Sequence, residues 1–491
     1  MKRQEFLARY GAVYEHSQWV AERAYDGGIG NGADVAPVFR RIVDRAGHDA
    51  QLTLLRAHPD LAGRLGTALT AHSTAEQEGA GLNACSPEEF AEFSSLNETY
   101  KERFGFPFII AVKGLDRPTI LKRFRQRVEG TPEEEFGTAL NEVHKIAGLR
   151  LAALAAGPEV PREPVDLGEV LRLAERALTN AGADAANAAA VAQNIAAAER
   201  DGSESHGLFR LPGYCNGLRK GEVNGKAVPS VVSAAGASVV VDGDGGAAPV
   251  AYAVALPALA QKAEELGVAA LALRNTVHFA AMWPEVEWLC ERGLAAFAAT
   301  ANYPYLAPFG GTRPFFGTNP IAFAYPTGST PVVFDFATSA MARGDIMLAG
   351  RDGRQVGEAV GIDRYGEPTS DPAAILDGAQ LPFGAHKGSA IALMVELLAA
   401  GLIGDVFSDE NAIRADPTGL PLGGVFILAI SPRALGGAEA IARSAAWVER
   451  LAAEPGVRVP GQRRHKKRAA GGPAMVERAL LEKVRALADE A

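Results

Sequence analysis

Apolar residues in the first third of the chain recur at spacings of three and four. The segment VFRRIVDRAGHDAQLTLLRAHPDLAGRL (38–65) shows this helical period, and runs of β-branched residues that are typical of strands are few before residue 157. The pattern therefore predicts an all-α domain over residues 1–157.

Three prolines follow in the stretch GPEVPREPV (157–165). Each proline removes an amide donor and fixes φ, so this stretch cannot continue a helix and is expected to be extended. We predict a linker over residues 158–165. A helix is predicted to start again at Asp166, whose side chain can cap the first turn together with Glu169 three positions later.

The pattern changes from about residue 230. β-Branched runs such as SVVVD (238–242) and PVVFDFA (331–337) alternate there with helical segments such as VALPALAQKAEELG (254–267). This alternation predicts a mixed α/β domain, which we place at residues 166–465.

The last segment, residues 466–491, is expected to be a separate basic and helical tail. The cluster RRHKKR (463–468) fits a solvated charge run in an acidic chain better than a phosphate-binding or RNA-binding patch. Val476, Leu480, Val484 and Leu487 fall on one face of the helical segment after it, which fits either a subunit contact or a surface helix.

Composition narrows the classes of protein. A length of 491 residues favours more than one domain, and 48% hydrophobic against 22% charged residues is typical of folded chains rather than disordered or fibrous ones. The net charge of -9 gives no basic field that would attract nucleic acid or an anionic membrane. The expected partners are therefore small molecules.

Cysteine content and hydropathy bear on the compartment. Cys85, Cys215 and Cys290 match neither a disulfide framework nor a metal-binding spacing, which fits a reducing cytoplasm. The N-terminal stretch lacks the apolar run of a signal peptide, and the run SAIALMVELLAAGLIG (389–404) is too short to span a bilayer and contains Glu396. We expect a cytoplasmic protein that is neither exported nor embedded in a membrane.

The helical part contains five polar residues of chemical interest: His58, Ser73, Glu76, Gln77 and Arg150. Each has an ordinary structural explanation, because a histidine beside proline often ends a helix, S-x-x-E is a capping box, and an arginine in a last helix is commonly a surface charge. Taken singly, these residues do not assign a function.

The amino-acid sequence around these residues resembles that of a specific family. The motifs that carry the resemblance, in chain order, are EHSQWVAERA (15–24), HPDLAG (58–63), STAEQEGAGL (73–82), FSSLNETYKERFGFPFIIAVKG (93–114) and NEVHKIAGLRL (141–151). They are similar to those of 2-oxo-4-hydroxy-4-carboxy-5-ureidoimidazoline (OHCU) decarboxylase over nearly all of residues 1–157. The resemblance implies an all-helical, cofactor-free domain that forms (S)-allantoin in the last step of urate degradation.

Decarboxylation of OHCU requires residues of these chemical types. Loss of CO2 from OHCU leaves an enolate-like carbanion, so the site must hold the leaving carboxylate, stabilise the developing charge and deliver one proton. His58 suits the proton donor because the pKa of imidazole lies near neutral pH. The resemblance implies that Glu76 pairs with His58, that Arg150 holds a carboxylate or oxyanion, and that no metal is needed. The other substrate contacts that it implies are Pro59, Ser73, Gln77, Phe106, Pro107, Phe108 and Ile109.

The second domain contains a pattern that by itself favours a Rossmann fold. Gly243-x-Gly245-x-x-Ala248 follows the predicted strand SVVVD, and a helix opens at Pro249. Arg274 ends the next predicted strand, where an enzyme specific for NADP would place a cation. From this segment alone we would expect a dinucleotide to lie across the glycines.

The sequence of the second domain as a whole resembles a different NAD(P)-binding family. Its motifs here are SESHGLFRLPGY (203–214), NTVHFAAMWPE (275–285), FGTNPIAFAYP (316–326), FDFATSAMARGDI (334–346) and LPFGAHKGSAIALMVE (381–396). They are similar to the malate/L-lactate dehydrogenase-like family over residues 165–465, which implies a non-Rossmann fold and makes the glycines at 243–246 a strand-to-helix turn. HFAAMWPE, NYPYLAP and TSAMARGDI look most like Δ1-piperideine-2-carboxylate/Δ1-pyrroline-2-carboxylate reductases, whereas sister members oxidise 2-hydroxy acids such as malate, lactate and ureidoglycolate.

Hydride chemistry assigns roles to the polar residues of these motifs. Hydride addition to an imine carbon leaves nitrogen in need of a proton, and the resemblance implies His206 as the donor with Ser205 as its relay. Arg210 lies four residues after His206, so one helical turn would let it grip the substrate carboxylate from the same face. The alternative for Ser205 and His206 is a capped helix start. The resemblance completes the acid pocket with Thr318, Arg343 and Gly344.

The resemblance also implies NADPH or NADH as the cofactor of this domain. HKGS opens an apolar helix, so free backbone amides and the positive end of the helix dipole would coincide with Lys387 and suit a phosphate. The cofactor contacts that the resemblance implies are His278, Phe279, Ala280, Ala281, Met282, Phe336, Ala337, Thr338, His386, Lys387, Gly388, Ser389 and Ala390.

The resulting hypothesis is a bifunctional enzyme, an OHCU decarboxylase fused to an NAD(P)H-dependent reductase of cyclic imine carboxylates. Two alternatives stay open. The second domain could be a ureidoglycolate or other 2-hydroxy-acid dehydrogenase, which pathway logic favours, or one domain could be a non-catalytic oligomerisation scaffold. A homodimer or higher homo-oligomer is expected.

Overall fold

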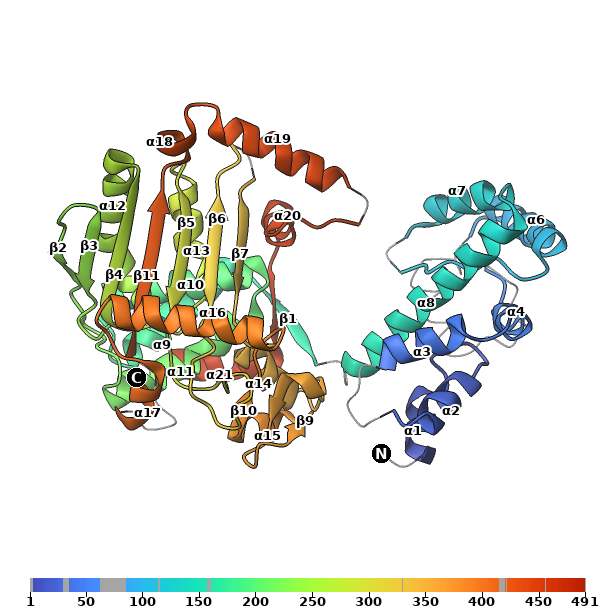
Figure 1. The fold of residues 1–491 in the computed structure, drawn as a ribbon, viewed down its shortest axis with the longest axis horizontal. Helices are drawn as coiled ribbons and strands as arrows, with labels where there is room; N and C mark the ends of the chain where they lie inside the picture. Colours follow the sequence, from blue (N-terminus) through green and yellow to red (C-terminus); the bar gives the residue numbers. More distant parts are fainter. Residues whose placement is uncertain are drawn as a thin grey trace. The chain divides into compact units, whose positions relative to one another are not determined.

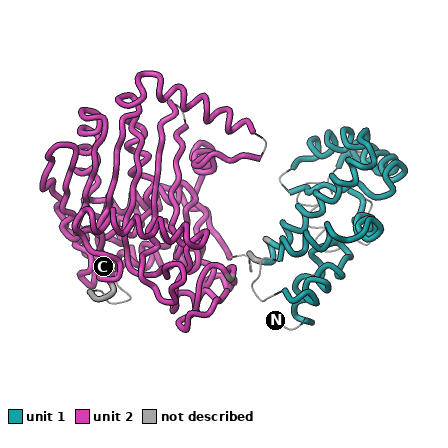
Figure 2. Tube along the Cα trace, viewed as in Figure 1, with its two compact units in different colours: residues 1–158 teal, residues 159–491 magenta. Residues whose placement is uncertain are grey.

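The computed structural model describes residues 3–29, 35–61, 85–113, 115–156, 160–328, 330–414, 420, 422–454 and 456–490. The chain divides into two compact units, Met1–Pro158 and Glu159–Ala491 (Figure 2). Each unit buries a hydrophobic core of its own.

Every element of unit 1 that the structure describes is a helix, which confirms the predicted all-α domain. Its core is aromatic: Tyr100, Phe93 and Phe124 are fully buried, and the ring of Phe108 stacks on that of Phe124. The described helices are α1 (Arg3–Tyr10), α2 (Trp19–Asp26), α3 (Val35–Asp44), α4 (His48–Arg56), α6 (Pro87–Phe104), α7 (Arg117–Val128) and α8 (Pro132–Ala156).

Unit 2 is built on a seven-stranded sheet in the order β2-β3-β4-β11-β5-β6-β7 (Figure 1). Only the β3–β4 pair is parallel among these neighbours, and every other pair is antiparallel. A doubly wound Rossmann sheet is mostly parallel, so the predicted non-Rossmann α/β fold is confirmed. The strands are β2 (Ser230–Ser233), β3 (Ser238–Asp242), β4 (Val268–Val277), β5 (Ala295–Thr300), β6 (Ile321–Tyr325), β7 (Val332–Phe336) and β11 (Leu422–Ile430).

The glycines after β3 form a turn whose backbone amides donate hydrogen bonds to strand β4. Gly243 N donates to Arg274 O at 2.8 Å and Gly245 N donates to Asn275 O at 2.9 Å, so both amides are bonded to β4. Gly245 has φ +66°, a conformation that favours glycine, and a Cβ on Gly246 would collide with Ala227. The glycines are therefore explained by the turn itself.

Helices cover both faces of the sheet. The helices α12 (Ala248–Leu266) and α13 (Trp283–Cys290) share a core with one set of alternating strand residues, such as Ile427. The helix α16 (His386–Glu396) and the π-helical segment η5 (Leu397–Leu402) pack on the opposite set, such as Phe426.

A small sheet of order β10-β8-β9 lies apart from the main one. It is built from β8 (Gly361–Ile362), β9 (Pro368–Thr369) and β10 (Ala379–Gln380), with α14 (Arg343–Arg351) and α15 (Pro372–Asp377) beside it.

The two ends of unit 2 are joined, which corrects the expected linker and tail. Strand β1 (Arg162–Val165) pairs antiparallel with β12 (Ala474–Glu477), so part of the expected linker and part of the expected tail form one ribbon. Helix α21 (Arg478–Asp489) buries Leu481 and Val484 against α9 (Leu167–Asn180). Asp166 caps α9 as predicted, whereas Glu169, expected to share in the cap, pairs with Arg485. Val476 belongs to the strand rather than the helix. The remaining helices are α10 (Ala185–Asp201), α11 (Leu211–Lys220), α17 (Ser408–Arg414), α18 (Pro432–Gly436), α19 (Ala440–Ala453) and α20 (Gln462–Ala470).

The basic cluster lies in α20 and is not the solvated run that we expected. Arg468 forms ion pairs with Asp201 at the end of α10 and with Glu287 in α13, and both carboxylates are buried. The guanidinium of Arg464 lies over the ring of Trp283, 4.1 Å from its centroid. The basic residues neutralise carboxylates that α10 and α13 bury between them, a requirement that the charge pattern of the sequence alone does not reveal.

We expect Arg468→Met to lower the free energy of unfolding of unit 2 by about 2–3 kcal/mol, because two buried carboxylates lose their shared guanidinium, although Asp201 keeps its ion pair with Arg200. Denaturant unfolding followed by tryptophan fluorescence measures the change, since Trp283 lies beside this cluster. Lys466→Met, on an exposed position of the same helix, is the control and should have little effect. Equal stability of the two variants would contradict the structural role of the cluster.

Candidate active sites

In unit 1, His58 lies in a turn after α4 that is held from two sides. Nδ1 of His58 donates to Leu54 O at 3.0 Å, since a carbonyl oxygen can only accept, so acid–base chemistry would change the protonation of Nε2. Helix α6 fixes the residues that follow, because Asn97 donates to Leu61 O at 2.9 Å and Lys101 pairs with Asp60 at 2.7 Å. The turn that carries His58 and the half-buried Pro59 is thereby anchored to two helices.

The predicted backbone contacts of unit 1 lie in a buried segment. The side chains of Phe106, Pro107, Phe108 and Ile109 are all buried, so they turn into the core. Arg127 donates to Ile109 O at 2.8 Å and lies over the ring of Phe108. Backbone atoms of this segment therefore have fixed positions, as a binding surface requires.

Arg150 is held in a buried ion pair that the sequence did not predict. It donates to Glu15 at 2.6 Å, and both side chains are buried. Glu15 opens the EHSQWVAERA motif, so the only signal in the sequence was a carboxylate inside a motif. The other three predicted residues of this site, Ser73, Glu76 and Gln77, lie outside the described residues.

In unit 2, Ser205, His206 and Arg210 lie on two consecutive 3₁₀ turns, η2 (Glu204–His206) and η3 (Leu208–Arg210). Gly207 separates the turns with ψ −139°, so the expected single helical turn between His206 and Arg210 is wrong. The two turns still meet at one site, because a Cβ on Gly344 would lie 2.8 Å from Cβ of Ser205 and 3.1 Å from Nη2 of Arg210. Ser205 Oγ and His206 Nδ1 are 3.3 Å apart, within hydrogen-bonding distance.

Two guanidinium groups and two imidazoles meet at the site, and the carboxylate of Asp345 opposes the repulsion between Arg210 and Arg343. Burial, together with the nearby Arg210 and His278, lowers the pKa of His206 to about 3, so its imidazole is neutral at pH 7 in the absence of ligand. Burial also lowers the pKa of Arg210 to about 10, and Arg343 adds to this effect by repulsion. None of the described carboxylates forms a salt bridge with Arg210 or Arg343, and Nε of Arg210 is buried without a hydrogen-bond partner.

Aromatic rings and a glycine hold the two arginines at the site. The guanidinium of Arg210 lies 4.3 Å from the ring centroid of Phe279, and that of Arg343 lies 3.7 Å from the centroid of Tyr305. The absence of a Cβ on Gly344 lets the start of α14 approach the turns η2 and η3. Tyr305, which sequence reasoning missed, lies in the NYPYLAP segment that carried part of the resemblance.

The structure brings the predicted cofactor segments together at the end of β7. Asp335 accepts a hydrogen bond from Met282 N at 2.7 Å, which ties the segment 278–282 to the residue before Phe336. Thr338 N donates to Thr318 O at 2.8 Å, and Thr338 O accepts from Phe383 N at 3.0 Å in the loop before α16. Ala281 and Met282 have buried side chains and support the segment from the core, whereas Phe336 is 41% exposed.

The start of α16 differs in one respect from our expectation of free amides. Lys387 N donates to Gly384 O at 3.2 Å and Gly388 N donates to Phe383 O at 3.0 Å, because the preceding loop folds back over the first turn. Ser389 Oγ accepts from Phe309 N at 3.0 Å. The side chains of His386 and Lys387 and that of Ala390 are exposed, so this end of the helix offers a cation rather than a row of unbonded amides.

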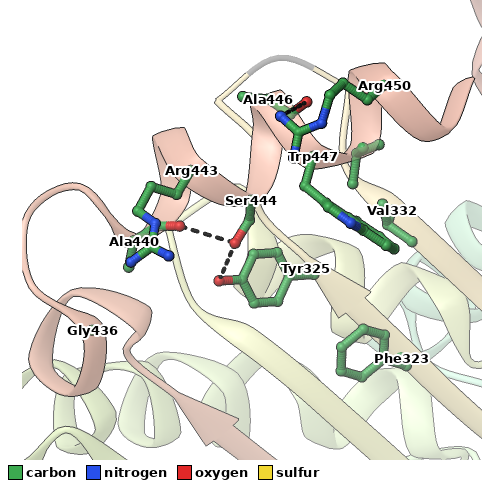
Figure 3. A pocket seen from close by; sticks show the side chains of 11 residues that line it. Phe323, Tyr325, Val332, Gly436, Ala440, Arg443, Ser444, Ala446, Trp447 and Arg450 are labelled. Atoms are coloured by element: carbon green, nitrogen blue, oxygen red, sulfur yellow. Dashed lines mark hydrogen bonds between the residues drawn. The ribbon is translucent and has the colours of Figure 1, made fainter. Parts of the chain in front are cut away.

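A groove of about 760 Å³ lies elsewhere, between α19 and the strands β6 and β7 (Figure 3). Its walls include Phe323 and Tyr325 of the sheet and Trp447 of α19, and Ser444 donates to the hydroxyl of Tyr325. None of the predicted site residues is among the residues that line it. Within the described ranges, no group of three or more His, Cys, Asp or Glu side chains could hold a metal ion, and no helix is long and apolar enough to cross a membrane.

Two family profiles match the chain. The profile described as malate/L-lactate dehydrogenase matches residues 165–482, and the profile described as OHCU decarboxylase matches residues 1–152. Together they span both units of the structure.

Individual relatives match the second unit. A Δ1-pyrroline-2-carboxylate/Δ1-piperideine-2-carboxylate reductase of Pseudomonas putida is 45% identical over 307 residues, which cover 62% of this chain and 90% of that protein. A protein of the same description from Pseudomonas syringae pv. tomato is 45% identical over 318 residues, which cover 64% and 93%. The crystal structure of Δ1-piperideine-2-carboxylate reductase from P. syringae pv. tomato has a TM-score of 0.63 and 43% identity, with 66% of this chain and 99% of that chain covered.

The two candidate cofactor positions can be separated by mutation. We expect Lys387→Ala to weaken NADPH binding about fivefold, since an exposed charge pair contributes up to about 1 kcal/mol. Gly245→Ala is expected to lower stability, because of the positive φ, and to leave NADPH affinity within about twofold of wild type. Fluorescence titration of the full chain with NADPH measures both affinities, and the reverse order would favour a dinucleotide across the glycines.

Proposed function

Since this chain belongs to the malate/L-lactate dehydrogenase family and carries an OHCU decarboxylase domain before it, we propose that it is a bifunctional enzyme. Unit 1 decarboxylates OHCU to (S)-allantoin. Unit 2 reduces a cyclic imine 2-carboxylate, piperideine-2-carboxylate or pyrroline-2-carboxylate, with NAD(P)H. The named relatives of the second unit, at 45% identity, support this substrate class over the hydroxy acids.

The observation that carries the reductase assignment is the pair of half-buried arginines that form no salt bridge among the described residues. Arg210 and Arg343 are held at one site by aromatic rings, and a substrate carboxylate would supply the missing negative charge. The same carboxylate would offset the repulsion that Arg210 exerts on His206 and so raise the pKa of the imidazole. Substrate binding thereby prepares the proton donor.

The residues of unit 2 fit a nicotinamide cofactor. The three segments at 278–282, 336–338 and 386–390 meet at the end of β7, where His278 has a buried Nε2 without a hydrogen-bond partner and Lys387 offers a cation for phosphate. A nicotinamide cofactor held by these segments would supply hydride to the imine carbon. His206 supplies the proton to the imine nitrogen, Ser205 relays it, and Arg210 and Arg343 orient the carboxylate so that the imine nitrogen faces His206.

In unit 1 we assign the proton delivery to His58 and the binding of a carboxylate or oxyanion to Arg150. The anchoring of the His58 turn to α4 and α6 supports the first role, because general acid catalysis needs a fixed donor. The role of Arg150 rests on the resemblance of the motif that contains it, and its ion pair with Glu15 holds the guanidinium in one direction. Glu76 would pair with His58, and Ser73, Gln77 and the backbone of Phe106–Ile109 would contact the ring.

One observation favours a second candidate for unit 2, a 2-hydroxy-acid dehydrogenase such as one for ureidoglycolate. A pKa of about 3 leaves His206 neutral, and a neutral imidazole can accept the proton of a hydroxyl group.

We further infer a homo-oligomer, which the exposed apolar side chains of Leu393, Met394 and Leu397 on α16 and η5 support.

The pH dependence separates the two candidates. If His206 donates the proton, its protonated fraction in the free enzyme falls about tenfold per pH unit above its pKa, so kcat/KM for imine reduction should fall steeply from pH 5 to pH 8. If His206 accepts a proton from a hydroxy acid, it is already neutral over that range, and kcat/KM for ureidoglycolate oxidation should show no rise from this group.

Parallel profiles of His206→Ala give the control, because titration of the substrate itself persists in that variant. Imine reduction at the wild-type rate in His206→Ala would remove the residue from the mechanism. Oxidation of ureidoglycolate without any imine reduction by the wild type would replace the reductase assignment.

The two activities should be lost independently. His58→Ala is expected to lower OHCU decarboxylation by about 10²–10⁴-fold, the usual contribution of a general acid, and to leave imine reduction unchanged. Following OHCU consumption by ultraviolet absorbance in the full chain, with EDTA present, measures this. His206→Ala is the matched control and should retain full decarboxylase activity, while loss of wild-type decarboxylation in EDTA would contradict the metal-free mechanism.

A further inference from the structure

Glu199, near the end of α10, has a buried carboxylate whose partner lies between the two catalytic turns. Its side chain is 6% exposed, and Oε1 accepts a hydrogen bond from Leu208 N at 2.8 Å. Leu208 begins η3, the turn that carries Arg210, and follows Gly207, which ends η2 with Ser205 and His206. The carboxylate therefore contacts the backbone at the break that sets the two turns relative to each other.

Gly207 is the counterpart of this carboxylate. A Cβ at position 207 would collide with the carboxylate of Glu199, so the glycine leaves the notch that Glu199 fills. Space for the carboxylate thus explains a glycine at this position.

Helix α20 holds the other side of Glu199. Lys467 Nζ donates to Glu199 O at 3.3 Å, and its side chain lies close over Gly202, where a Cβ would be 2.8 Å from Nζ. Ser203 N donates to Ala198 O at 2.8 Å at the same helix end. The chain that enters the catalytic turns is therefore fixed both before Ser205 and after Gly207.

We propose that Glu199 is a positioning residue of unit 2, whose carboxylate holds the break at Gly207 and so sets His206 and Arg210 at their mutual distance. Glu199 acts through the backbone of Leu208, and the proposal rests on the proposed reductase function for its kinetic consequence. The structural consequence, an ordered segment 203–211, holds whatever the substrate is.

The raised pKa of the Glu199 carboxyl group makes its contribution to local order dependent on pH. Burial raises its pKa from 4.5 to about 7, Glu204 in η2 adds to the increase, and the Leu208 amide, Lys467 of α20 and Arg162 of β1 oppose it. A group whose pKa is higher in the ordered state stabilises that state at low pH and loses this contribution between about pH 4.5 and pH 7. Order in the segment 203–211 should therefore decrease as the pH rises through this window.

Hydrogen exchange of the full chain, read by mass spectrometry on peptides covering 203–211, tests the proposal without any substrate. In wild type, protection of this segment, corrected for intrinsic exchange rates, is expected to fall at least about tenfold from pH 5 to pH 7. Glu199→Gln keeps an acceptor for Leu208 N without a charge and should keep protection that does not vary with pH. Glu199→Ala should lose protection at every pH.

Steady-state kinetics with piperideine-2-carboxylate and NADPH provide the second readout. Glu199→Ala is expected to lower kcat/KM for the imine about tenfold at pH 6 while NADPH affinity stays within about twofold, and Glu199→Gln should stay within about threefold of wild type. Glu199→Asp withdraws the carboxylate by one methylene and should behave as alanine, which covers the case of an alanine variant that fails to fold. Gln193→Ala, on an exposed position of α10, is the control.

The outcomes are distinct. Local loss of protection at 203–211 in the alanine and aspartate variants, with rescue by glutamine, supports the proposal. Unchanged protection in those variants, or a glutamine variant as impaired as the others, overturns it. A wild-type chain that reduces no imine overturns the proposed function instead, and the exchange data then decide the role of Glu199 separately.

Discussion

Two half-buried guanidinium groups that form no salt bridge among the described residues are the constraint on which the site of unit 2 depends. Arg210 and Arg343 lie against aromatic rings, and burial lowers the pKa of both guanidinium groups. Such an arrangement costs free energy in the protein alone and is relieved when an anion binds. Burial, together with Arg210 and His278, keeps His206 neutral, so in the proposed mechanism an anionic ligand both fills the site and raises the pKa of the imidazole.

The fold supplies this arrangement by bringing distant segments to one end of the sheet. The turns η2 and η3 follow α10 and are bonded to its Glu199. The segment after β4 is bonded to Asp335 of β7, and Thr338 after β7 accepts a hydrogen bond from Phe383 in the loop before α16. The buried pair of Arg468 with Asp201 and Glu287 then fixes α10 to α13. Basic residues at the C-terminal end of the chain thus stabilise the elements that carry the site.

Periodicity and capping chemistry were sufficient to predict the helical first unit, the mixed second unit and the start of α9 at Asp166, because these depend on local patterns. The predictions that failed depend on contacts between distant segments. Arg468 looks solvated in the sequence because its partners, Asp201 and Glu287, lie far away along the chain. The spacing of His206 and Arg210 indicates one helical turn, and nothing in the sequence reveals that the Glu199 carboxylate occupies the space beside Gly207. Likewise, the Gly243–Gly246 turn fits a dinucleotide fingerprint until β4 is seen to bind its amides.

The central claim is that a bound carboxylate raises the pKa of His206, and an NMR titration of ¹⁵N-labelled histidine tests it directly. The comparison is between the ligand-free chain and the chain with L-pipecolate, a carboxylate that cannot turn over without oxidised cofactor. We expect a pKa near 3 without ligand, an increase of about one unit or more with it, and no ligand-dependent change in Arg210→Met. A pKa near 6.5 in the ligand-free chain, or the same value with and without ligand, would contradict the account.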